Sequence, residues 1–233
     1  MTMDISGVSC PLPVGATADA VRTGGTVVLG YGVSNRPLVQ LLLRLGASVT
    51  VYDQKPVEEL GEDAAAAKRA GVRFVQQLTA LDPSNVRVVF RSPGFRPDLP
   101  FLTAARRCGA RVTSEMEWFL ELTPATVIGV TGSDGKTTTS TLTAKLLAAA
   151  VGEQHVYLGG NIGRPLLPLA TAMTDRDFAV VELSSFQLMD MQHAPRRAAI
   201  TNVTPNHLNW HVDMEEYATA KTRIFQGAGC ETL

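Results

Sequence analysis

A glycine-rich stretch at residues 129–138 constrains the fold of this chain more than any other feature of the sequence. The four residues before it, 125–128, are small, β-branched or apolar and predict a buried strand. Residues 139–150 after it carry leucines at helical spacing, and Gly152 stands where a helix is expected to end. A strand that passes through a glycine loop into a helix presents backbone N–H groups to an anion, most simply a nucleotide phosphate.

Two side chains of this stretch add chemistry to the loop. Lys136 supplies a positive charge for the β- and γ-phosphates, and the hydroxyl of Thr137 is placed to reach a magnesium ion. The spacing departs from a generic Walker A loop, because five residues rather than four separate Gly129 from Gly135. The alternative is a plain glycine-rich turn, but the order of strand, loop, Lys-Thr and helix favours a phosphate loop.

Composition excludes several classes of protein. The 233 residues are 45% hydrophobic and 18% charged, which suits one large or two small ordered domains and argues against disorder. A net charge of −1 gives no general attraction to nucleic acid or membrane. Cys10, Cys108 and Cys230 lie far apart and indicate neither a disulfide framework nor a zinc site. We see no signal-peptide pattern and no membrane-length apolar run, so we expect a cytoplasmic protein.

The first half of the chain alternates strands and helices. We expect strands at 26–29, 48–52, 72–75, 86–90 and 110–113, and helices that end near 45 and span 64–70 and 99–107. The opening βαβ unit is Rossmann-like, but Asn35 stands where a third glycine would be needed, so NAD binding is the less favoured interpretation. Asp53, at the tip of the second strand, is predicted to contact a ligand, against the alternative of a turn residue. Gly94 lies in a Pro-Gly turn at a strand end, which is either a ligand contact or a plain turn.

The second half places an acidic residue beside the phosphate loop. Glu182 follows an expected buried strand at 177–181, as a magnesium-binding carboxylate of a P-loop protein does, although a surface glutamate is the alternative. Residues 159–165, with Asn161, are expected to form a loop, and Ser184 and Gln187 could cap a helix or orient a substrate.

A last strand is expected at 198–203, followed by two histidines. His207 and His211 would share a metal-binding face only if their segment were helical. Lys221 lies within a helix expected at 215–225 and is by default a solvated lysine.

In this order the motifs resemble the Mur ligases of peptidoglycan synthesis, and the loop form also occurs in folylpolyglutamate synthetases. The resembling segments are residues 129–138, 160–165, 182–188, 202–208 and 217–221. Segment 182–188 is most similar to the members that add D-glutamate to UDP-N-acetylmuramoyl-L-alanine. The resemblance implies an α/β fold: a Rossmann-like UDP-substrate-binding domain at 1–113, then the first part of a P-loop ATPase-type parallel-sheet domain at 114–233.

The resemblance also implies the roles of individual residues. ATP would be bound by Gly132, Ser133, Asp134, Gly135, Lys136, Thr137 and Thr138. Thr137 and Glu182 would hold one magnesium ion, and His207 and a carbamylated Lys221 a second, so that Lys136, Glu182, His207 and Lys221 form the catalytic set. The UDP-substrate would contact Ser34, Asp53 and Gly94, with Asn161, Ser184 and Gln187 near its muramoyl end.

The implied reaction transfers the γ-phosphate of ATP to the alanyl carboxylate. The amine of D-glutamate then attacks the acyl phosphate, which gives an amide, ADP and phosphate. Such an enzyme acts in cell-wall synthesis, and through it in cell shape and division. We expect a monomer that binds the small molecules ATP, UDP-N-acetylmuramoyl-L-alanine and D-glutamate, with no nucleic-acid partner and no membrane span.

Two departures from the family pattern shape what we expect. Many relatives have Asp-His-x-Asp-Arg where this chain has residues 206–210, so two carboxylates near the second metal are replaced by Asn206 and Asn209. Family members also carry more ATPase-domain strands and a third domain that supplies adenine and amino-acid contacts. We therefore expect an uncovered sheet edge and no complete ligase reaction from these 233 residues alone.

Three alternatives stay open on the sequence. One is a non-catalytic protein that binds a UDP-sugar with its first domain. The second is another ligase of the Mur or folylpolyglutamate type. The third is a small-molecule kinase, against which segment 182–188 and the Rossmann-like first unit both argue.

Overall fold

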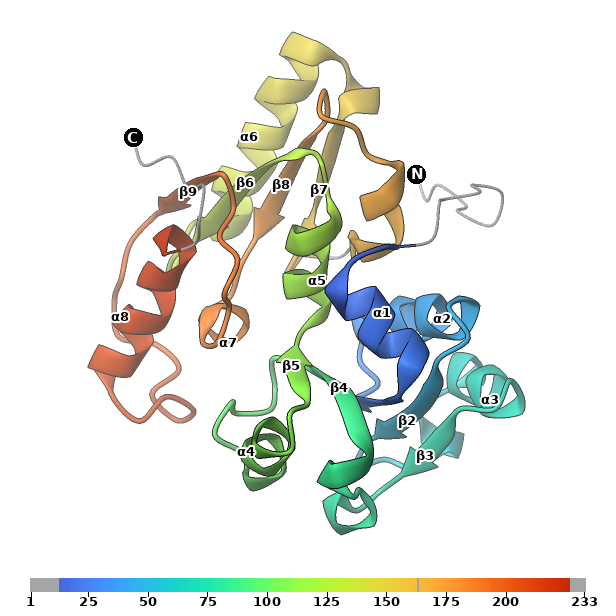
Figure 1. Cartoon of the computed structure of the whole chain (residues 1–233). Helices are drawn as coiled ribbons and strands as arrows, with labels where there is room; N and C mark the ends of the chain where they lie inside the picture. Colours follow the sequence, from blue (N-terminus) through green and yellow to red (C-terminus); the bar gives the residue numbers. More distant parts are fainter. Residues whose placement is uncertain (1–12, 163, 227–233) are drawn as a thin grey trace.

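The computed structural model describes residues 13–162 and 164–226, and its strands form two parallel sheets (Figure 1). The first sheet has the order β3-β2-β1-β4-β5 and the second the order β7-β8-β6-β9. The strands of the first sheet are β1 Gly25–Leu29, β2 Ser48–Tyr52, β3 Arg73–Val75, β4 Val86–Arg91 and β5 Arg111–Thr113. Those of the second are β6 Thr126–Thr131, β7 Val156–Gly160, β8 Phe178–Glu182 and β9 Arg197–Ile200. The predicted α/β class is confirmed.

Helices connect the parallel strands, as parallel pairing requires. They are α1 Ala16–Thr23, α2 Asn35–Arg44, α3 Glu62–Arg69, α4 Pro100–Arg107, α5 Glu115–Leu122, α6 Lys136–Val151, α7 Ser185–Leu188 and α8 Met214–Thr222. Short 3-10 turns lie at Val57–Glu59, Leu78–Ala80, Pro83–Asn85, Glu153–His155, Leu167–Ala172 and Arg223–Phe225. No described helix combines the length and apolar character that crossing a lipid bilayer requires.

The strand order creates one switch point in each sheet. In the first, β2 and β3 are added on one side of β1, and β4 and β5 are then added on its other side, so the switch point lies between β1 and β4. In the second, β6 lies between β8 and β9. Ligands of open parallel sheets bind outside the carboxyl ends of the strands at such points. The loops after β1, β4 and β6 are therefore the places where a site is expected.

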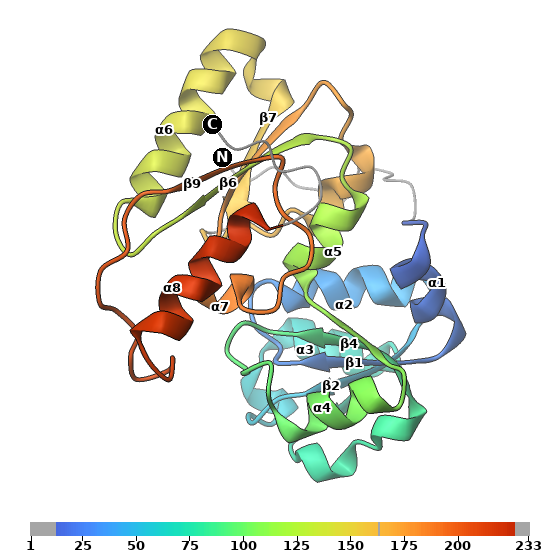
Figure 2. The same cartoon turned by 60° about the vertical axis from the view of Figure 1, so that its left-hand side comes forward.

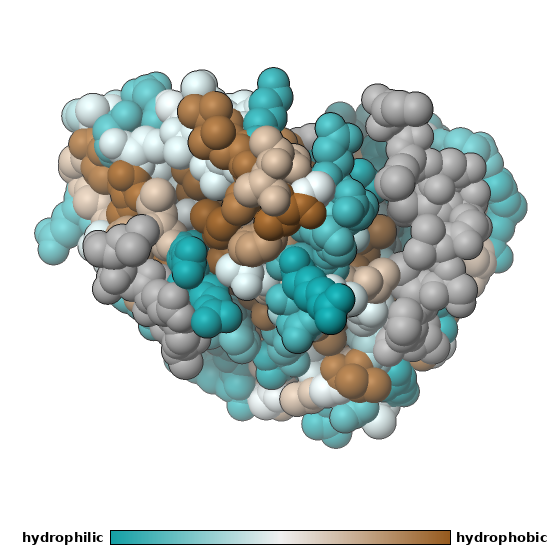
Figure 3. All heavy atoms as spheres, turned by 90° about the horizontal axis from the view of Figure 1, so that it is seen from above, coloured by the Kyte–Doolittle hydropathy of each residue, from teal (hydrophilic) through white to brown (hydrophobic). Residues whose placement is uncertain are grey.

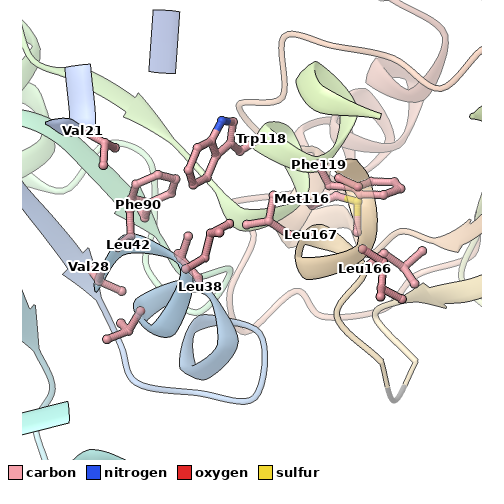
Figure 4. Close-up of a cluster of buried hydrophobic side chains, with 14 of the residues drawn as sticks. Val21, Val28, Leu38, Leu42, Phe90, Met116, Trp118, Phe119, Leu166 and Leu167 are labelled. Atoms are coloured by element: carbon pink, nitrogen blue, oxygen red, sulfur yellow. The ribbon is translucent and has the colours of Figure 1, made fainter. Parts of the chain in front are cut away.

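The hydrophobic core is continuous between the two sheets. Helix α5 lies between them, and its residues Met116, Trp118 and Phe119 are almost fully buried (Figures 1 and 4). The same apolar cluster includes Leu38 of α2 on one side and Leu167 on the other. A separate cluster covers the opposite face of the first sheet, around β1, β4 and α4. Because α5 contributes apolar side chains to both neighbours, the two sheets pack through it rather than being joined by a linker.

Helix α6 carries exposed apolar side chains. Leu142 and Leu146, which the spacing had assigned to a helix face, are exposed, and the residues of α6 that are buried are Ser140 and Ala144. Figure 3 shows apolar residues gathered on the side of the molecule where α6 lies in Figure 1. Among the described residues, β9 pairs only with β6 and is the most exposed strand of its sheet.

The structure corrects several predicted elements. Helix α1 and strand β7 were not predicted, and Gly159 and Gly160 end β7 rather than starting a loop. A Cβ on Gly159 would lie 2.4 Å from the carbonyl oxygen of Arg164, so this strand needs glycine for close packing. The strand predicted at 198–203 is β9 and stops at Ile200, because the backbone from Thr201 onward bonds to the glycine loop instead.

The boundaries of helices α6 and α8 also differ from the predicted ones. Helix α6 begins at Lys136, three residues before the predicted start, because Gly135 adopts a left-handed φ of 77° and serves as its N-cap. Helix α8 ends at Thr222, and residues Arg223–Phe225 continue as a 3-10 turn. Of the three cysteines, Cys108 is exposed and free, whereas Cys10 and Cys230 lie outside the described residues.

One buried carboxyl group lies at the junction of the two sheets. Glu115, in the first turn of α5, is 5% exposed, and its Oε1 accepts a hydrogen bond of 3.2 Å from the backbone N–H of Leu167. Burial raises the pKa of Glu115 from 4.5 to about 7. The folded state therefore holds a proton between pH 4.5 and 7 that the unfolded chain has already released, and stability falls as pH rises through this window.

Replacing Glu115 with glutamine tests this assignment. The amide keeps the acceptor for Leu167 but cannot ionise, so the free energy of unfolding of Glu115→Gln, measured relative to the parent chain, should improve by roughly 2–3 kcal/mol between pH 5 and pH 8. Urea unfolding across this pH range is the measurement. Glu59→Gln, at an exposed position, is the control and should show no such trend. A pH-independent difference for Glu115→Gln would contradict the buried, protonated carboxyl.

Candidate nucleotide and substrate site

The glycine loop runs directly from β6 into α6. Gly132 has a φ of 150°, and a Cβ there would lie 1.9 Å from the hydroxyl of Thr201, so glycine is required for the loop to approach β9. Gly135 then turns the chain into α6. The N–H groups of the first helical turn have no acceptors within the helix, and they point out of the loop together with the positive end of the helix dipole. The loop therefore has the geometry of an anion site.

The chain after β9 braces this loop. The N–H of Ser133 donates to the carbonyl of Asn202 at 3.0 Å, and the side-chain oxygen of Asn202 accepts from the N–H of Asp134 at 3.0 Å. The hydroxyl of Thr201 donates to the carbonyl of Asp134 at 2.6 Å. Because these bonds use the N–H groups of Ser133 and Asp134, the groups left for an anion are those from Gly135 onward.

Lys136 lies over the loop. Its ammonium donates to the carbonyls of Gly132 and Ser133 at 2.9 and 2.8 Å. The cation is thus held within the loop that it is predicted to serve.

Thr137, Glu182 and Asn161 meet beside the loop. The Thr137 hydroxyl donates to Oε2 of Glu182 at 2.7 Å, and the Asn161 amide donates to Oε1 at 2.8 Å. Glu182 is 2% exposed at the end of β8, and its carbonyl also accepts the N–H of Asn161 at 2.8 Å. The structure brings together Thr137 and Glu182, which were predicted as partners. Asn161, which was predicted near the substrate, also contacts Glu182.

A magnesium ion suits these donors. Hydroxyl and carboxylate oxygens are the ligands that this ion prefers, and it characteristically completes its shell with water and phosphate oxygens. The Thr137–Glu182 hydrogen bond shows that both oxygen atoms can reach one small volume next to the loop. Within the described residues no group of three or more His, Cys, Asp or Glu side chains is arranged so that it could hold a metal ion by itself.

Lys221 is a correction to the default interpretation of a solvated helix lysine. It is 1% exposed, its ammonium donates to the carbonyl of Gly132 at 2.8 Å, and it lies 4.5 Å from the ring centroid of Tyr217. Burial, and secondarily the charge of Lys136, lowers the pKa of Lys221 to about 8. The sequence could not show this, because the burial arises from contact with a loop 89 residues away.

The two histidines do not share a helical face. The segment between β9 and α8 is irregular, and His207 has a φ of 55° and is exposed. His211 is buried, with Nδ1 and Nε2 within hydrogen-bonding distance of Glu216 and Ser185 at 3.1 and 2.9 Å. The metal face that a helix would have made is therefore absent. The His207 ring instead packs against the rings of Phe186 and Tyr217, with distances of 5.0 and 6.4 Å between ring centroids.

The predicted ligand residues of the first sheet lie at the carboxyl ends of its strands. Asp53 accepts hydrogen bonds from the N–H groups of Tyr31 and Lys55 at 2.8 and 3.0 Å. It lines a cavity of about 230 Å³ with Lys55, Phe74 and Gln76. Gly94 is exposed in the turn closed by the bond from the N–H of Phe95 to the carbonyl of Ser92 at 3.0 Å. Asp53 thus has the bonds of a turn residue and also borders an open cavity.

Ser34 and Gln187 face each other across the junction of the two sheets. They line a small cavity, which also includes Arg91 and Glu115. Ser184 and Gln187 form a capping box at the start of α7: the Gln187 N–H donates to the Ser184 hydroxyl at 3.3 Å, and the Ser184 N–H donates to the Gln187 side chain at 2.9 Å. The helix-capping role, one of the two possibilities that the sequence left open, is therefore present.

Sequence reasoning missed residues that act at a distance. Tyr217 is buried, and its hydroxyl lies 2.9 Å from the hydroxyl of Ser133 in the glycine loop. Thr201 and Asn202 brace the same loop. Thr201 was expected within a strand, and Asn202 and Tyr217 lie in segments that resemble the Mur ligases, but neither signal indicated which loop these residues would reach.

These features define a class of protein. A parallel α/β chain in which a glycine loop, a Lys-Thr helix start and a carboxylate from the neighbouring strand meet is a P-loop nucleotide-binding protein in architecture. Residues 130–232 match the family model described as the Mur ligase middle domain. The chain belongs to the Mur ligase family, as the resemblance predicted.

Two curated relatives carry the same name, UDP-N-acetylmuramoylalanine--D-glutamate ligase. The protein from Clostridium novyi (strain NT) is 44% identical over 209 residues, covering 89% of this chain and 45% of the relative. The protein from Clostridium kluyveri is 47% identical over 200 residues, covering 85% of this chain and 43% of the relative. The chain therefore spans about half the length of the curated relatives it matches.

A solved structure shares the fold. The UDP-N-acetylmuramate:L-alanyl-gamma-D-glutamyl-meso-diaminopimelate ligase from Neisseria meningitides superposes with a TM-score of 0.52 at 18% identity. The match covers 87% of this chain and 67% of that chain. At this identity it supports the fold alone.

The end of β7 supplies a test of the Glu182 environment. Gly160 has a φ of 93°, and a Cβ there would lie 2.3 Å from the carbonyl oxygen of Glu182. Gly160→Ala should therefore destabilise the chain by roughly 1–3 kcal/mol, because backbone atoms must shift. Gly32→Ala, where nothing lies within 4 Å of the added carbon, is the matched control. Equal thermal unfolding midpoints for the two variants would contradict this packing.

Proposed function

We propose that this chain forms the UDP-substrate and nucleotide-phosphate sites of an ATP-dependent ligase. The ligase joins D-glutamate to UDP-N-acetylmuramoyl-L-alanine through an acyl phosphate, as part of peptidoglycan synthesis in the cytoplasm. The names of the Clostridium relatives support the substrates. The observation that carries the nucleotide assignment is the pairing of Thr137 with buried Glu182 beside the glycine loop.

The two parts of the chain have separate tasks in this proposal. We assign residues 1–113 to the UDP-substrate, with Ser34, Asp53 and Gly94 as contacts, and residues 114–233 to ATP. The N–H groups at the start of α6 and the Lys136 ammonium neutralise charge on the transferred phosphoryl group, which is the main requirement of this chemistry. Ser184 and Gln187, which lie on the side of the second sheet that faces Ser34, would flank the muramoyl end.

Magnesium would be held by Thr137 and Glu182, with Asn161 orienting the carboxylate. When bound, the ion supplies positive charge to the phosphate oxygens. His207 and Lys221 are proposed as a second metal-binding pair, because both lie against the ring of Tyr217. Burial of Lys221 favours its neutral amine, which is the form that reacts with carbon dioxide to give a carbamate and a proton. Asn206 and Asn209 leave this second site with fewer carboxylates than many relatives have.

The separation of the two sites gives a binding test. Lys136→Ala should reduce binding of ATP at least tenfold, because it removes the only lysine or arginine of residues 129–138, while binding of UDP-N-acetylmuramoyl-L-alanine is retained. Titration calorimetry with each ligand is the measurement. Lys145→Ala, an exposed lysine of the same helix, is the control and should alter neither affinity. Equal loss of both ligands in Lys136→Ala would refute the two-site assignment.

The complete reaction is tested by phosphate release. With ATP and UDP-N-acetylmuramoyl-L-alanine, we expect no D-glutamate-dependent release by these 233 residues, since they span about half the length of the relatives. A longer polypeptide, in which this chain is continued by the remaining half of a relative, should show it. Binding of the UDP-ligand by a longer polypeptide that does not turn over ATP would favour the alternative of a UDP-sugar-binding protein. Amide product formed by the short chain alone would overturn the expectation.

A further inference from the structure

Two arginines bracket the turn at residues 92–94, and both reach across to the second sheet's helices. Arg91 is the last residue of β4, and Arg96 follows the turn. Their partners lie on or next to α7 and α8, which pack side by side (Figure 2). The turn that carries Gly94 is therefore attached to the part of the chain that contacts the glycine loop.

Arg91 is buried and donates hydrogen bonds to several partners in both parts of the chain. It is 1% exposed, and its guanidinium forms a two-pronged pair with the carboxylate of Asp190. It also donates to the carbonyl of Phe186 in α7 at 3.1 Å and to that of Phe95 in its own turn at 2.7 Å. A guanidinium has five N–H donors in a fixed plane, so these contacts leave the Arg91 side chain little freedom to move relative to its partners. The turn and the end of α7 are thus held in one geometry.

Arg96 makes the second attachment. Its guanidinium pairs with both oxygens of Glu216 at 2.8 and 3.2 Å and donates to the carbonyl of Trp210 at 2.9 Å. It also pairs with Asp98 at 3.1 Å on its own side. These hydrogen bonds from Arg96 lower the pKa of Glu216 to about 2, so the pair is ionised over the whole working range of pH. Glu216 in turn accepts from the N–H of Val212 at 2.9 Å, which fixes it at the start of α8.

Two further residues of α8 contact the glycine loop. Tyr217 follows Glu216 and meets the hydroxyl of Ser133 at 2.9 Å, and Lys221 donates to the carbonyl of Gly132 at 2.8 Å. Helix α8 therefore touches the first sheet's turn through Glu216 and the phosphate loop through Tyr217 and Lys221. A nine-residue helix is stiff over this length. We therefore expect a displacement of α8 at Glu216 to move Tyr217 and Lys221 relative to the glycine loop as well.

We propose that Arg91 and Arg96 are positioning residues that couple occupancy of the turn at 92–94 to the phosphate loop, with α8 as the connecting element. The inference rests on the proposed function, because it takes the UDP-substrate as the ligand of the turn. Binding of that ligand orders the turn and holds α8 against the loop, directly through the Arg96–Glu216 pair and, for Arg91, by way of α7, which packs on α8. By linkage, the nucleotide must then raise the affinity for the UDP-ligand by the same factor.

Calorimetry on the 233-residue chain measures this coupling directly. The affinity for the magnesium complex of ADP is determined with and without saturating UDP-N-acetylmuramoyl-L-alanine. We expect the UDP-ligand to raise the nucleotide affinity about fivefold or more in the unsubstituted chain. Arg96→Gln and Glu216→Gln should each reduce this factor to about one, while the affinity for each ligand measured alone stays within about twofold. The two substitutions combined should do no more than either alone, because they break the same pair.

Controls separate positioning from loss of structure. Arg69→Gln removes an exposed arginine that pairs with Glu62 in the same sheet unit, and it should leave the coupling unchanged. Arg96→Lys keeps the charge and should recover part of the coupling, which a variant that acts only by unfolding would not do.

The outcomes distinguish the two proposals. A chain that binds both ligands but shows no coupling, or keeps full coupling in Arg96→Gln and Glu216→Gln, overturns this inference and leaves the proposed function standing. An unsubstituted chain that does not bind the UDP-ligand overturns the proposed function and the inference with it.

Discussion

Parallel pairing of every described strand is the constraint on which the rest of this structure depends. Because parallel strands point the same way, all loops that follow them gather at one edge of each sheet. Ser34 lies in the loop after β1 and Arg91 is the last residue of β4, and both line one cavity with Gln187 of α7. The carboxyl-terminal edge of the first sheet thus faces α7 of the second. In the proposed function, this arrangement directs a substrate held at the first sheet toward the second.

The polar centre of the second sheet is built around groups that are costly to bury. Glu182 and Lys221 are both almost fully buried, and neither would be stable there without partners. Glu182 has the Thr137 hydroxyl and the Asn161 amide, and Lys221 has a loop carbonyl and an aromatic ring. These contacts offset the cost of burial and hold both side chains beside the glycine loop. Such environments are typical of functional sites rather than of structural cores.

Helix α5 determines how the two sheets sit relative to each other. Its apolar side chains join a core that includes α2 on one side and the 3-10 turn Leu167–Ala172 on the other (Figure 4). Buried Glu115 lies at the same junction with an N–H partner from Leu167. The Arg91–Asp190 and Arg96–Glu216 pairs close the other side of the junction. An apolar core and a set of directional ion pairs therefore act together on the same interface.

Local patterns in the sequence determined much of this protein. The strand–loop–helix around Lys136, the βαβ unit that ends at Asp53 and the placement of Glu182 at a strand end all follow from neighbouring residues, because periodicity and glycine positions are short-range signals. The resemblance to the Mur ligases rested on the same local segments. Strand β7 was missed because two glycines at its end looked like a loop, although close packing against Arg164 and Glu182 is what requires them.

Only the tertiary structure decided which distant residues meet. The burial of Lys221 against Gly132, the contact of Asn161 with Glu182 and the pairing of Arg96 with Glu216 join positions between 21 and 120 residues apart. No periodicity within one segment carries information about a partner in another, since such contacts depend on how the sheets and helices pack. The default prediction of a solvated lysine at position 221 was wrong for this reason. The sequence by itself determined the strand, glycine loop and helix around Lys136, and the packing of α8 decided which distant side chains lie against that loop.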